Sequence, residues 1–264
     1  MELDNEIAKL LNTERVTLAT IGYSNEKVYF LDRGYQGKDV VLKTSKRKEV
    51  LKEGMILSWL YPRIKTPKVY INKCIDGVYY LVMEKLEGQM MQETIFDSGI
   101  KEGIIQYALL IKRIHQIPYQ DFPFITTLED RVAEAKYNVE NDLVKTQYFE
   151  RELKDKSAEE VYELLISYYP QDEDKVLVHG DVCMPNFIMH LHQLSGIIDV
   201  GRMGVNDRYL DIAIALRTLR YNIELYGDVM TKEDINLFLD TYGIKNFNRE
   251  KFIFYILLDE LING

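Results

Sequence analysis

The side chains best suited to chemistry lie close together between residues 179 and 199. The stretch begins with His179-Gly180-Asp181, carries an amide at Asn186 five residues after the acid, and reaches a second acid at Asp199. A positioned carboxylate can orient a hydroxyl group and accept its proton. An amide paired with a second carboxylate offers the hard oxygen ligands that Mg²⁺ prefers. Asp181 is therefore a candidate base, and Asn186 and Asp199 are candidate magnesium ligands.

The spacing of these residues resembles the catalytic segment of protein kinases, in which an H-x-D-x-x-x-x-N loop precedes D-x-G. The resemblance implies phosphoryl transfer from a nucleotide, with Mg²⁺ held against the nucleotide phosphates. Two features differ from protein kinases. Gly180 replaces the Arg of H-R-D, and a helical pattern near 207–220 follows Asp199 too soon for an activation segment. We therefore expect the acceptor to be a small molecule and not a protein.

The composition indicates a cytoplasmic protein. The 264 residues are 47% hydrophobic, which suffices for the core of one two-lobed domain or two small ones. Cys74 and Cys183 are far apart in sequence, so a disulfide framework is not expected and a reducing compartment fits. The longest apolar run, residues 252–258, is too short to span a bilayer, and the N-terminus lacks the pattern of a signal peptide. We expect no membrane association and no obligate protein partner.

The net charge of −9 narrows the range of partners. No basic stripe is present that could neutralise the phosphates of a nucleic acid, so nucleic acid is not expected as a partner. An acidic cleft could concentrate a cationic substrate. Many cytoplasmic proteins are acidic, however, so the charge alone does not indicate such a substrate.

The order of the predicted elements indicates an α+β, bilobal fold. Strand-like runs at 16–21, 28–32 and 40–44, a helix at 46–60 and a hairpin turning at Asp76-Gly77 predict a β-rich N-terminal lobe, residues 1–86. The pattern then becomes mainly helical, which predicts a C-terminal lobe of residues 87–264. Capping-box signatures begin at Thr127, Ser157 and Thr231, and short strands are expected at 176–178, 187–189 and 197–200.

The N-terminal lobe contains the candidate nucleotide-binding residues. Lys43 ends an apolar strand, where a lysine could bind the nucleotide α- and β-phosphates. Its partner is expected on the following helix, at Glu53 or, one turn earlier, at Glu49. Three further positions are expected to contact the nucleotide. Ser24 is expected to bind a phosphate, and the backbone of Glu84 and Leu86 is expected to bind adenine.

Several longer motifs resemble the aminoglycoside 3′-phosphotransferases. They are His-Gly-Asp-x-Cys-x-Pro-Asn at 179–186, the run from Ile-Asp-x-Gly-Arg to Asp-Ile-Ala at 198–213, Leu-Leu-Asp-Glu-Leu at 257–261, and shorter matches at 22–29 and 58–60. The resemblance implies an antibiotic-resistance enzyme that transfers the γ-phosphate of ATP, with Mg²⁺, to the 3′-hydroxyl of kanamycin- or neomycin-type drugs. GTP stays possible as the donor, because Val41 stands where some members stack an aromatic ring on adenine.

The same resemblance implies a set of substrate-binding residues. Asp211, in the Asp-Ile-Ala motif, is expected to brace the catalytic loop. Arg202 is expected near the transferred phosphate, and the cationic drug would be surrounded by Arg217, Asp259, Glu260, Glu150 and Glu152. Carboxylates suit this task because they form charge-assisted hydrogen bonds to ammonium groups.

Two other hypotheses remain open from the sequence. A kinase of the same fold could act on another small alcohol, such as choline, a macrolide or an amino sugar. A silent nucleotide-binding protein is a third possibility, although the complete set Lys43, Glu53, Asp181, Asn186 and Asp199 argues against it.

Overall fold

The computed structural model describes residues 4–12, 15–19 and 26–263, and these form two compact units. The first unit contains Met1–Thr94 together with Pro185–Arg202, and the second contains Ile95–Met184 together with Met203–Gly264. The predicted lobes, 1–86 and 87–264, follow the order of the chain and stay a prediction. By packing, residues 87–94 and 185–202 group with the first unit, where Gln89 and Met90 pair with Met189 and Ile188.

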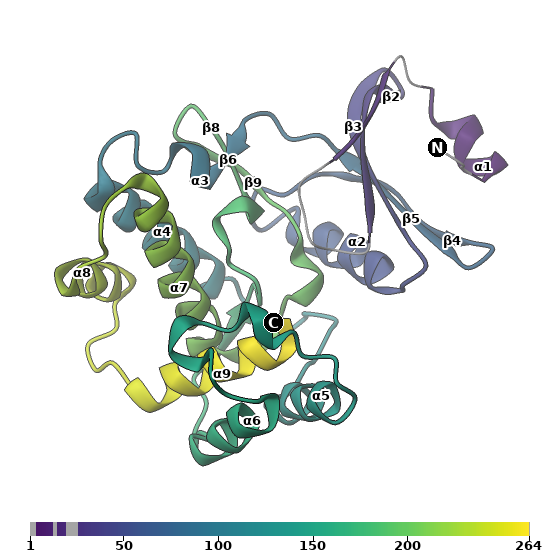
Figure 1. Ribbon diagram of the computed structural model, residues 1–264. Helices are drawn as coiled ribbons and strands as arrows, with labels where there is room; N and C mark the ends of the chain where they lie inside the picture. The colour runs from purple at the N-terminus through teal and green to yellow at the C-terminus, as the bar shows by residue number, and fades with distance from the viewer. Residues whose placement is uncertain (1–3, 13–14, 20–25, 264) are drawn as a thin grey trace. The chain divides into compact units, whose positions relative to one another are not determined.

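The first unit is built on a five-stranded antiparallel sheet with the order β1-β2-β3-β5-β4 (Figure 1). Its strands are β1 (Arg15–Leu18), β2 (Lys27–Tyr35), β3 (Lys38–Ser45), β4 (Val69–Ile75) and β5 (Val78–Glu84). The predicted Asp-Gly hairpin is confirmed: Asp76 and Gly77 both have positive φ, as a two-residue turn between β4 and β5 requires.

Alternation along β3 separates the apolar core of this unit from its polar face. Val40 and Leu42 are fully buried in a cluster that includes Ile7 of α1 (Asn5–Leu10). Because successive side chains point to opposite faces of a strand, Lys43 projects to the other face. There it meets α2 (Glu49–Leu60), whose buried residues include Glu53.

A second, three-stranded sheet completes the first unit. It has the order β6-β8-β9, with β6 (Gln89–Met90), β8 (Phe187–His190) and β9 (Gln193–Ile197), and the short helix α3 (Met91–Thr94) follows β6. The strand predicted at 197–200 is wrong beyond Ile197: β9 covers Gln193–Ile197, and Asp199 adopts a left-handed backbone with φ 55° that an extended strand does not allow. Val200–Arg202 instead forms a 3₁₀ turn that packs on α2.

The second unit is mainly helical. Its helices are α4 (Ile100–His115), α5 (Leu128–Glu140), α6 (Ala158–Ser167), α7 (Tyr209–Tyr226), α8 (Lys232–Tyr242) and α9 (Arg249–Asn263), with short 3₁₀ turns at Thr146–Tyr148 and Arg151–Leu153. Strands β7 (Lys175–Val178) and β10 (Gly204–Asp207) form a small antiparallel sheet. All three predicted capping boxes are present at the starts of α5, α6 and α8. The α+β class predicted from the sequence is thus confirmed.

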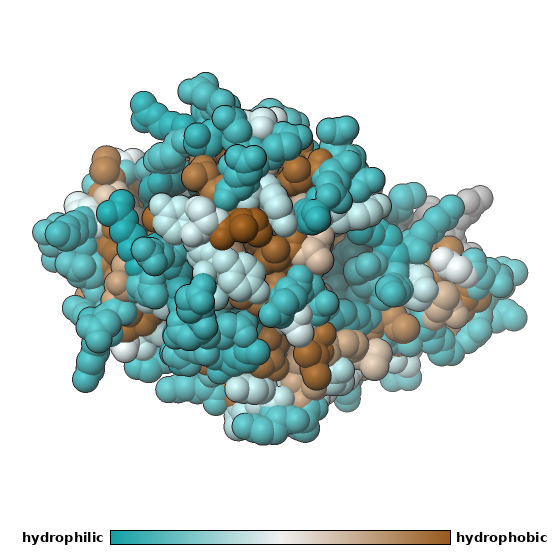
Figure 2. Space-filling model, turned by 90° about the horizontal axis from the view of Figure 1, so that it is seen from below, coloured by the Kyte–Doolittle hydropathy of each residue, from teal (hydrophilic) through white to brown (hydrophobic). Residues whose placement is uncertain are grey.

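The surface gives no sign of an extended apolar region on the face shown in Figure 2. There, apolar side chains reach the surface in small groups separated by hydrophilic residues. Such scattered exposure is ordinary, because apolar atoms contribute more than half of a typical protein surface. Within the described ranges, no helix is long and apolar enough to cross a membrane.

Candidate functional site

Lys43 lies at the centre of a cluster of carboxylates in the first unit. Its Nζ donates to Glu53 Oε2 at 2.7 Å and to Asp199 Oδ1 at 3.2 Å, and it lies 2.8 Å from Glu26 Oε2. The predicted Lys43–Glu53 pair is therefore present. Glu49, the alternative partner, is instead exposed and lies 3.9 Å from Arg47.

The environment keeps Lys43 charged. Burial lowers the pKa of Lys43, but the carboxylates of Glu53, Asp199 and Glu26 outweigh this effect and hold that pKa above its ordinary value of 10.5. Burial also raises the pKa of Glu53 to about 7, while Lys43 acts in the opposite direction. An ammonium group fixed in this way is suited to bind a phosphate anion.

Asn186 and Asp199 are brought to the same end of the β8–β9 hairpin. Asn186 directly precedes β8 and Asp199 follows β9 by two residues, and Phe187 pairs with Ile197 between them. The Ile198 N–H donates to the Asn186 carbonyl oxygen at 2.9 Å, which ties the two segments together. The Asp199 side chain is 52% exposed and can accept a ligand.

These donors fit Mg²⁺ bound together with phosphate. No group of three or more His, Cys, Asp or Glu side chains within the described residues could hold a metal ion. Mg²⁺ does not need one, because it usually takes one or two protein oxygen ligands and completes its shell with water and substrate phosphates. One amide oxygen and one carboxylate at a hairpin end meet that requirement.

Asp181 lies on the loop after β7 in the second unit, and the backbone of this loop is firmly held. Asp211 Oδ2 accepts from the His179 N–H at 2.7 Å, and Asp211 Oδ1 accepts from the Gly180 N–H at 2.9 Å. The Asp181 N–H donates to His179 Nδ1 at 3.3 Å. Gly180 has φ 81°, a conformation that a side chain would strain. The loop conformation thus explains why a glycine stands between His179 and Asp181.

The carboxylate of Asp211 is itself held by a buried network. His115 Nε2 lies 2.9 Å from Asp211 Oδ2, and His115 Nδ1 lies 2.6 Å from the Tyr242 hydroxyl. Arg208 Nη1 donates to that hydroxyl at 3.0 Å. Burial raises the pKa of Asp211, but the interactions with His115, His179 and Gly180 outweigh it and keep this pKa below its ordinary value. Asp211 is therefore ionised, and it braces the loop as the sequence predicted.

Most of the predicted drug-binding residues converge around Arg217 on α7. Its guanidinium pairs with Asp259, donates to Glu260 Oε1 at 3.2 Å and lies 4.0 Å from Glu150 Oε1. Glu150 also pairs with Arg220, which the sequence analysis did not single out. Burial raises the pKa of Glu260 to about 7, and Arg217 opposes this rise.

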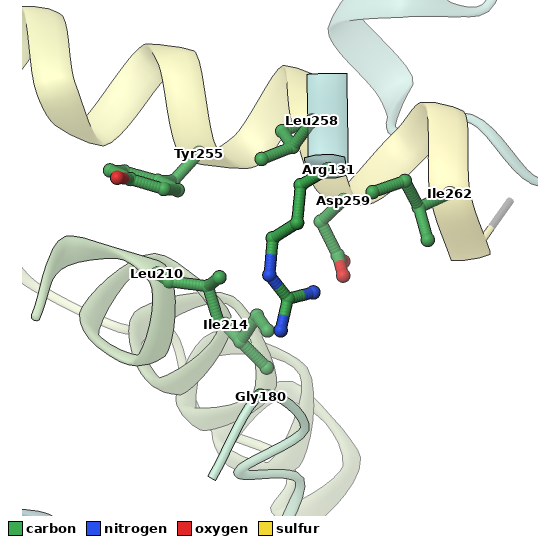
Figure 3. A pocket seen from close by; sticks show the side chains of 8 residues that line it. All are labelled: Arg131, Gly180, Leu210, Ile214, Tyr255, Leu258, Asp259 and Ile262. Atoms are coloured by element: carbon green, nitrogen blue, oxygen red, sulfur yellow. The ribbon is translucent and has the colours of Figure 1, made fainter. Parts of the chain in front are cut away.

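A small pocket lies beside Asp259 and the loop that carries Asp181. Figure 3 shows Arg131 of α5 extending into it toward Gly180 and Asp259, between apolar side chains of α7 and α9. The pocket thus lies between the loop that carries the candidate base and the acidic end of α9, within the same unit.

The remaining predicted residues occupy separate positions. Glu84 ends β5, and Leu86 packs against Gly196 of β9. Arg202 is exposed on the 3₁₀ turn after Asp199, and Glu152 is exposed on the turn Arg151–Leu153. Ser24 lies outside the described residues.

A β-rich unit with a buried lysine–glutamate pair, together with a braced loop that presents an acid, defines the kinase-like class of phosphotransferases. The chain belongs to the phosphotransferase enzyme family, which matches residues 15–234, and within it to the aminoglycoside 3′-phosphotransferases. The predicted resemblance is thereby confirmed.

Individual relatives support this assignment over nearly the whole chain. The aminoglycoside 3′-phosphotransferase of Niallia circulans is 35% identical over 258 residues, 97% of this chain and 95% of its own. That of Enterococcus faecalis is 33% identical and covers 99% of this chain and 98% of its own. The crystal structure of an aminoglycoside 3′-phosphotransferase of type VIII superposes with a TM-score of 0.78 at 29% identity, covering 93% of each chain. The kinase-like fold is thus confirmed as well.

Proposed function

We propose that this protein transfers the γ-phosphate of ATP to the 3′-hydroxyl of kanamycin- or neomycin-type aminoglycosides and thereby confers resistance to them. The observation that carries the proposal is the 35% identity to an aminoglycoside 3′-phosphotransferase over 97% of the chain. The held loop of Asp181 and the Lys43–Glu53 pair supply the chemistry that such a reaction needs. A reducing cytoplasm, where ATP is abundant, is the compartment we infer.

Asp181 has the central role in the proposed reaction. Its carboxylate orients the drug hydroxyl and accepts its proton as the new bond to phosphorus forms and the bond to the ADP oxygen breaks. Phosphoryl transfer through a loose transition state depends mainly on positioning. The hydrogen bonds from His179 and Gly180 to Asp211 provide that positioning on the protein side.

The first unit would bind the nucleotide. Lys43 binds the α- and β-phosphates and Glu53 orients Lys43, while Ser24 and Arg202 contact phosphate oxygens. The Glu84 carbonyl and the Leu86 amide recognise adenine. Asn186 and Asp199 are the residues that would hold Mg²⁺, which, when bound, neutralises charge on the phosphates.

The carboxylates around Arg217 would bind the cationic drug. Asp259, Glu260 and Glu150 already converge on this arginine, which fixes their positions. A polycationic sugar gains several charge-assisted hydrogen bonds from such a group. Glu152 would extend the acidic surface.

Replacing Glu53 by Gln is expected to raise the KM for ATP about tenfold, since one charge-assisted hydrogen bond that orients Lys43 is weakened. Thermal unfolding should shift to a lower temperature, because the variant removes one partner of a buried ion pair, so the kinetics are measured where the variant is folded. Steady-state kinetics at saturating drug measures the effect. Glu49→Gln, an exposed glutamate of the same helix, is the matched control and should leave the KM unchanged. An unaltered KM in Glu53→Gln would remove Glu53 from the proposed nucleotide site.

The proposed substrate is tested by a coupled assay of ADP release with ATP and Mg²⁺. Kanamycin should be turned over, and NMR of the product should place the phosphate on the 3′-oxygen. Tobramycin lacks the 3′-hydroxyl, so it should bind and inhibit without being phosphorylated there. Turnover of choline alone, or of none of these compounds, would contradict the proposal.

A further inference from the structure

Lys43 has more carboxylate partners than a phosphate-binding lysine needs. An ammonium group has three N–H donors. Three carboxylate oxygens surround Lys43 Nζ: Glu53 Oε2 at 2.7 Å, Glu26 Oε2 at 2.8 Å and Asp199 Oδ1 at 3.2 Å. Each donor therefore has an acid within reach, and a phosphate oxygen can bind Lys43 only if one carboxylate gives up its position.

Glu26 is the carboxylate that can leave most easily. Glu53 is on a helix and its side chain is only 3% exposed, so moving it away from Lys43 would leave a buried acid without its cation. Asp199 is already assigned to the metal in the proposed function. Glu26 is not assigned to the metal. It directly precedes β2, and its side chain is 15% exposed.

The balance of charges around Lys43 also favours the departure of one carboxylate. Lys43 contributes one positive charge, and Glu26, Glu53 and Asp199 together can contribute three negative ones. The phosphates of a nucleotide add several more negative charges beside the same ammonium group. Like charges at such short range repel strongly when partly shielded from water. Removing the surplus carboxylate should therefore favour the nucleotide.

We propose that Glu26 occupies the phosphate position on Lys43 and competes with the nucleotide for it, so that Glu26 limits the affinity for nucleoside di- and triphosphates. The proposal rests on the proposed function, because it takes Lys43 as a phosphate ligand. Glu26 is then a determinant of nucleotide affinity: it raises the KM for ATP and shortens the residence time of ADP.

Calorimetric titration of the full-length protein with ADP tests the proposal, once with Mg²⁺ and once with EDTA. In both conditions Glu26→Gln and Glu26→Ala should lower the Kd for ADP about three- to tenfold relative to the unsubstituted protein, the size expected for loss of a partly exposed competing ion pair. Circular dichroism and thermal unfolding verify that the variants are folded. Glu6→Gln is the matched control, since Glu6 also pairs with a lysine, Lys73 at 2.6 Å, but at an exposed position. It should leave the Kd unchanged.

The possible results separate this inference from the proposed function. An unchanged or higher Kd in both Glu26 variants overturns the inference while the protein still binds nucleotide. A loss of affinity only in the presence of Mg²⁺ also overturns it, because Glu26 would then act as a metal ligand. Failure of the unsubstituted protein to bind ADP at all would contradict the proposed function and the inference together.

Discussion

Asp211→Asn is expected to lower the free energy of unfolding by about 3–5 kcal/mol, because the substitution breaks a fully buried charged network. It is also expected to lower kcat about a hundredfold, because the loop that carries Asp181 loses its position. The carboxylate accepts hydrogen bonds from the His179 and Gly180 amides and contacts His115 Nε2 at 2.9 Å. In an asparagine, an NH₂ group replaces one of the two carboxylate oxygens. At least one of the groups that donate to Asp211 then faces another donor and loses its acceptor. Urea unfolding and steady-state kinetics at a temperature where the variant is folded measure the two effects.

The stability effect should depend on pH in a defined direction. The pKa of Asp211 in the folded protein lies below its ordinary value of 3.8, so its ionised form is stabilised by folding. The stability that it contributes is complete above that ordinary value and is lost as the pH falls through the folded pKa. The difference in unfolding free energy between Asp211→Asn and the unsubstituted protein should therefore shrink in acid. Asp240→Asn, an exposed aspartate on α8, is the matched control and should behave like the unsubstituted protein. A difference that grows toward low pH would contradict the assignment of Asp211 as an ionised brace.

Asp181→Asn is expected to lower kcat about 10²- to 10⁴-fold, the range that a positioned general base contributes. The KM for ATP should stay within about threefold, because the nucleotide is bound by other residues and a removed transition-state contact lowers kcat without weakening ground-state binding. Thermal unfolding should be nearly unchanged, because Asp181 is not fully buried and the backbone of its loop is held by Asp211. Rapid-quench measurement of a single turnover separates the chemical step from product release.

Asp240→Asn serves as the control here too and should keep full activity. A kcat of Asp181→Asn within about fivefold of the unsubstituted enzyme would exclude a general base at this position, since such a group contributes far more. A higher KM for ATP with an unchanged kcat in Asp181→Asn would indicate that Asp181 acts in nucleotide binding.

Local sequence signals predicted much of this molecule. The capping boxes at Thr127, Ser157 and Thr231 and the turn at Asp76-Gly77 depend on neighbouring residues, and all are present. The Lys43–Glu53 pair was predicted, with Glu49 as the alternative, because the kinase-like motif downstream requires a lysine on this strand and an acid on the next helix. The strand predicted at 197–200 is wrong beyond Ile197, where β9 ends, because the apolar pattern gave no sign of the left-handed backbone at Asp199.

The interactions that could not be predicted join residues far apart in sequence. His115 lies 96 positions before Asp211 and 127 before Tyr242, and no local pattern marks its role. On the amphipathic helix α4 it is indistinguishable from a residue of the apolar face. Glu26 was missed for a different reason: it lies within the match at 22–29, but at a position that the motif leaves open, and only the structure shows it at Lys43. Contacts between residues far apart in sequence, and the number of acids that surround one lysine, are determined by the folded structure and not by a local sequence pattern.

The brace at Asp211 also determines how long the reactive geometry persists. Catalytic loops are commonly among the mobile parts of a protein, and they open many times for each global unfolding event. Here the His179 and Gly180 amides donate to a carboxylate that is 0% exposed and that is also bonded to α4. Opening the loop therefore requires breaking hydrogen bonds to a buried carboxylate of the helical unit, so we expect slow hydrogen exchange at the His179 and Gly180 amides.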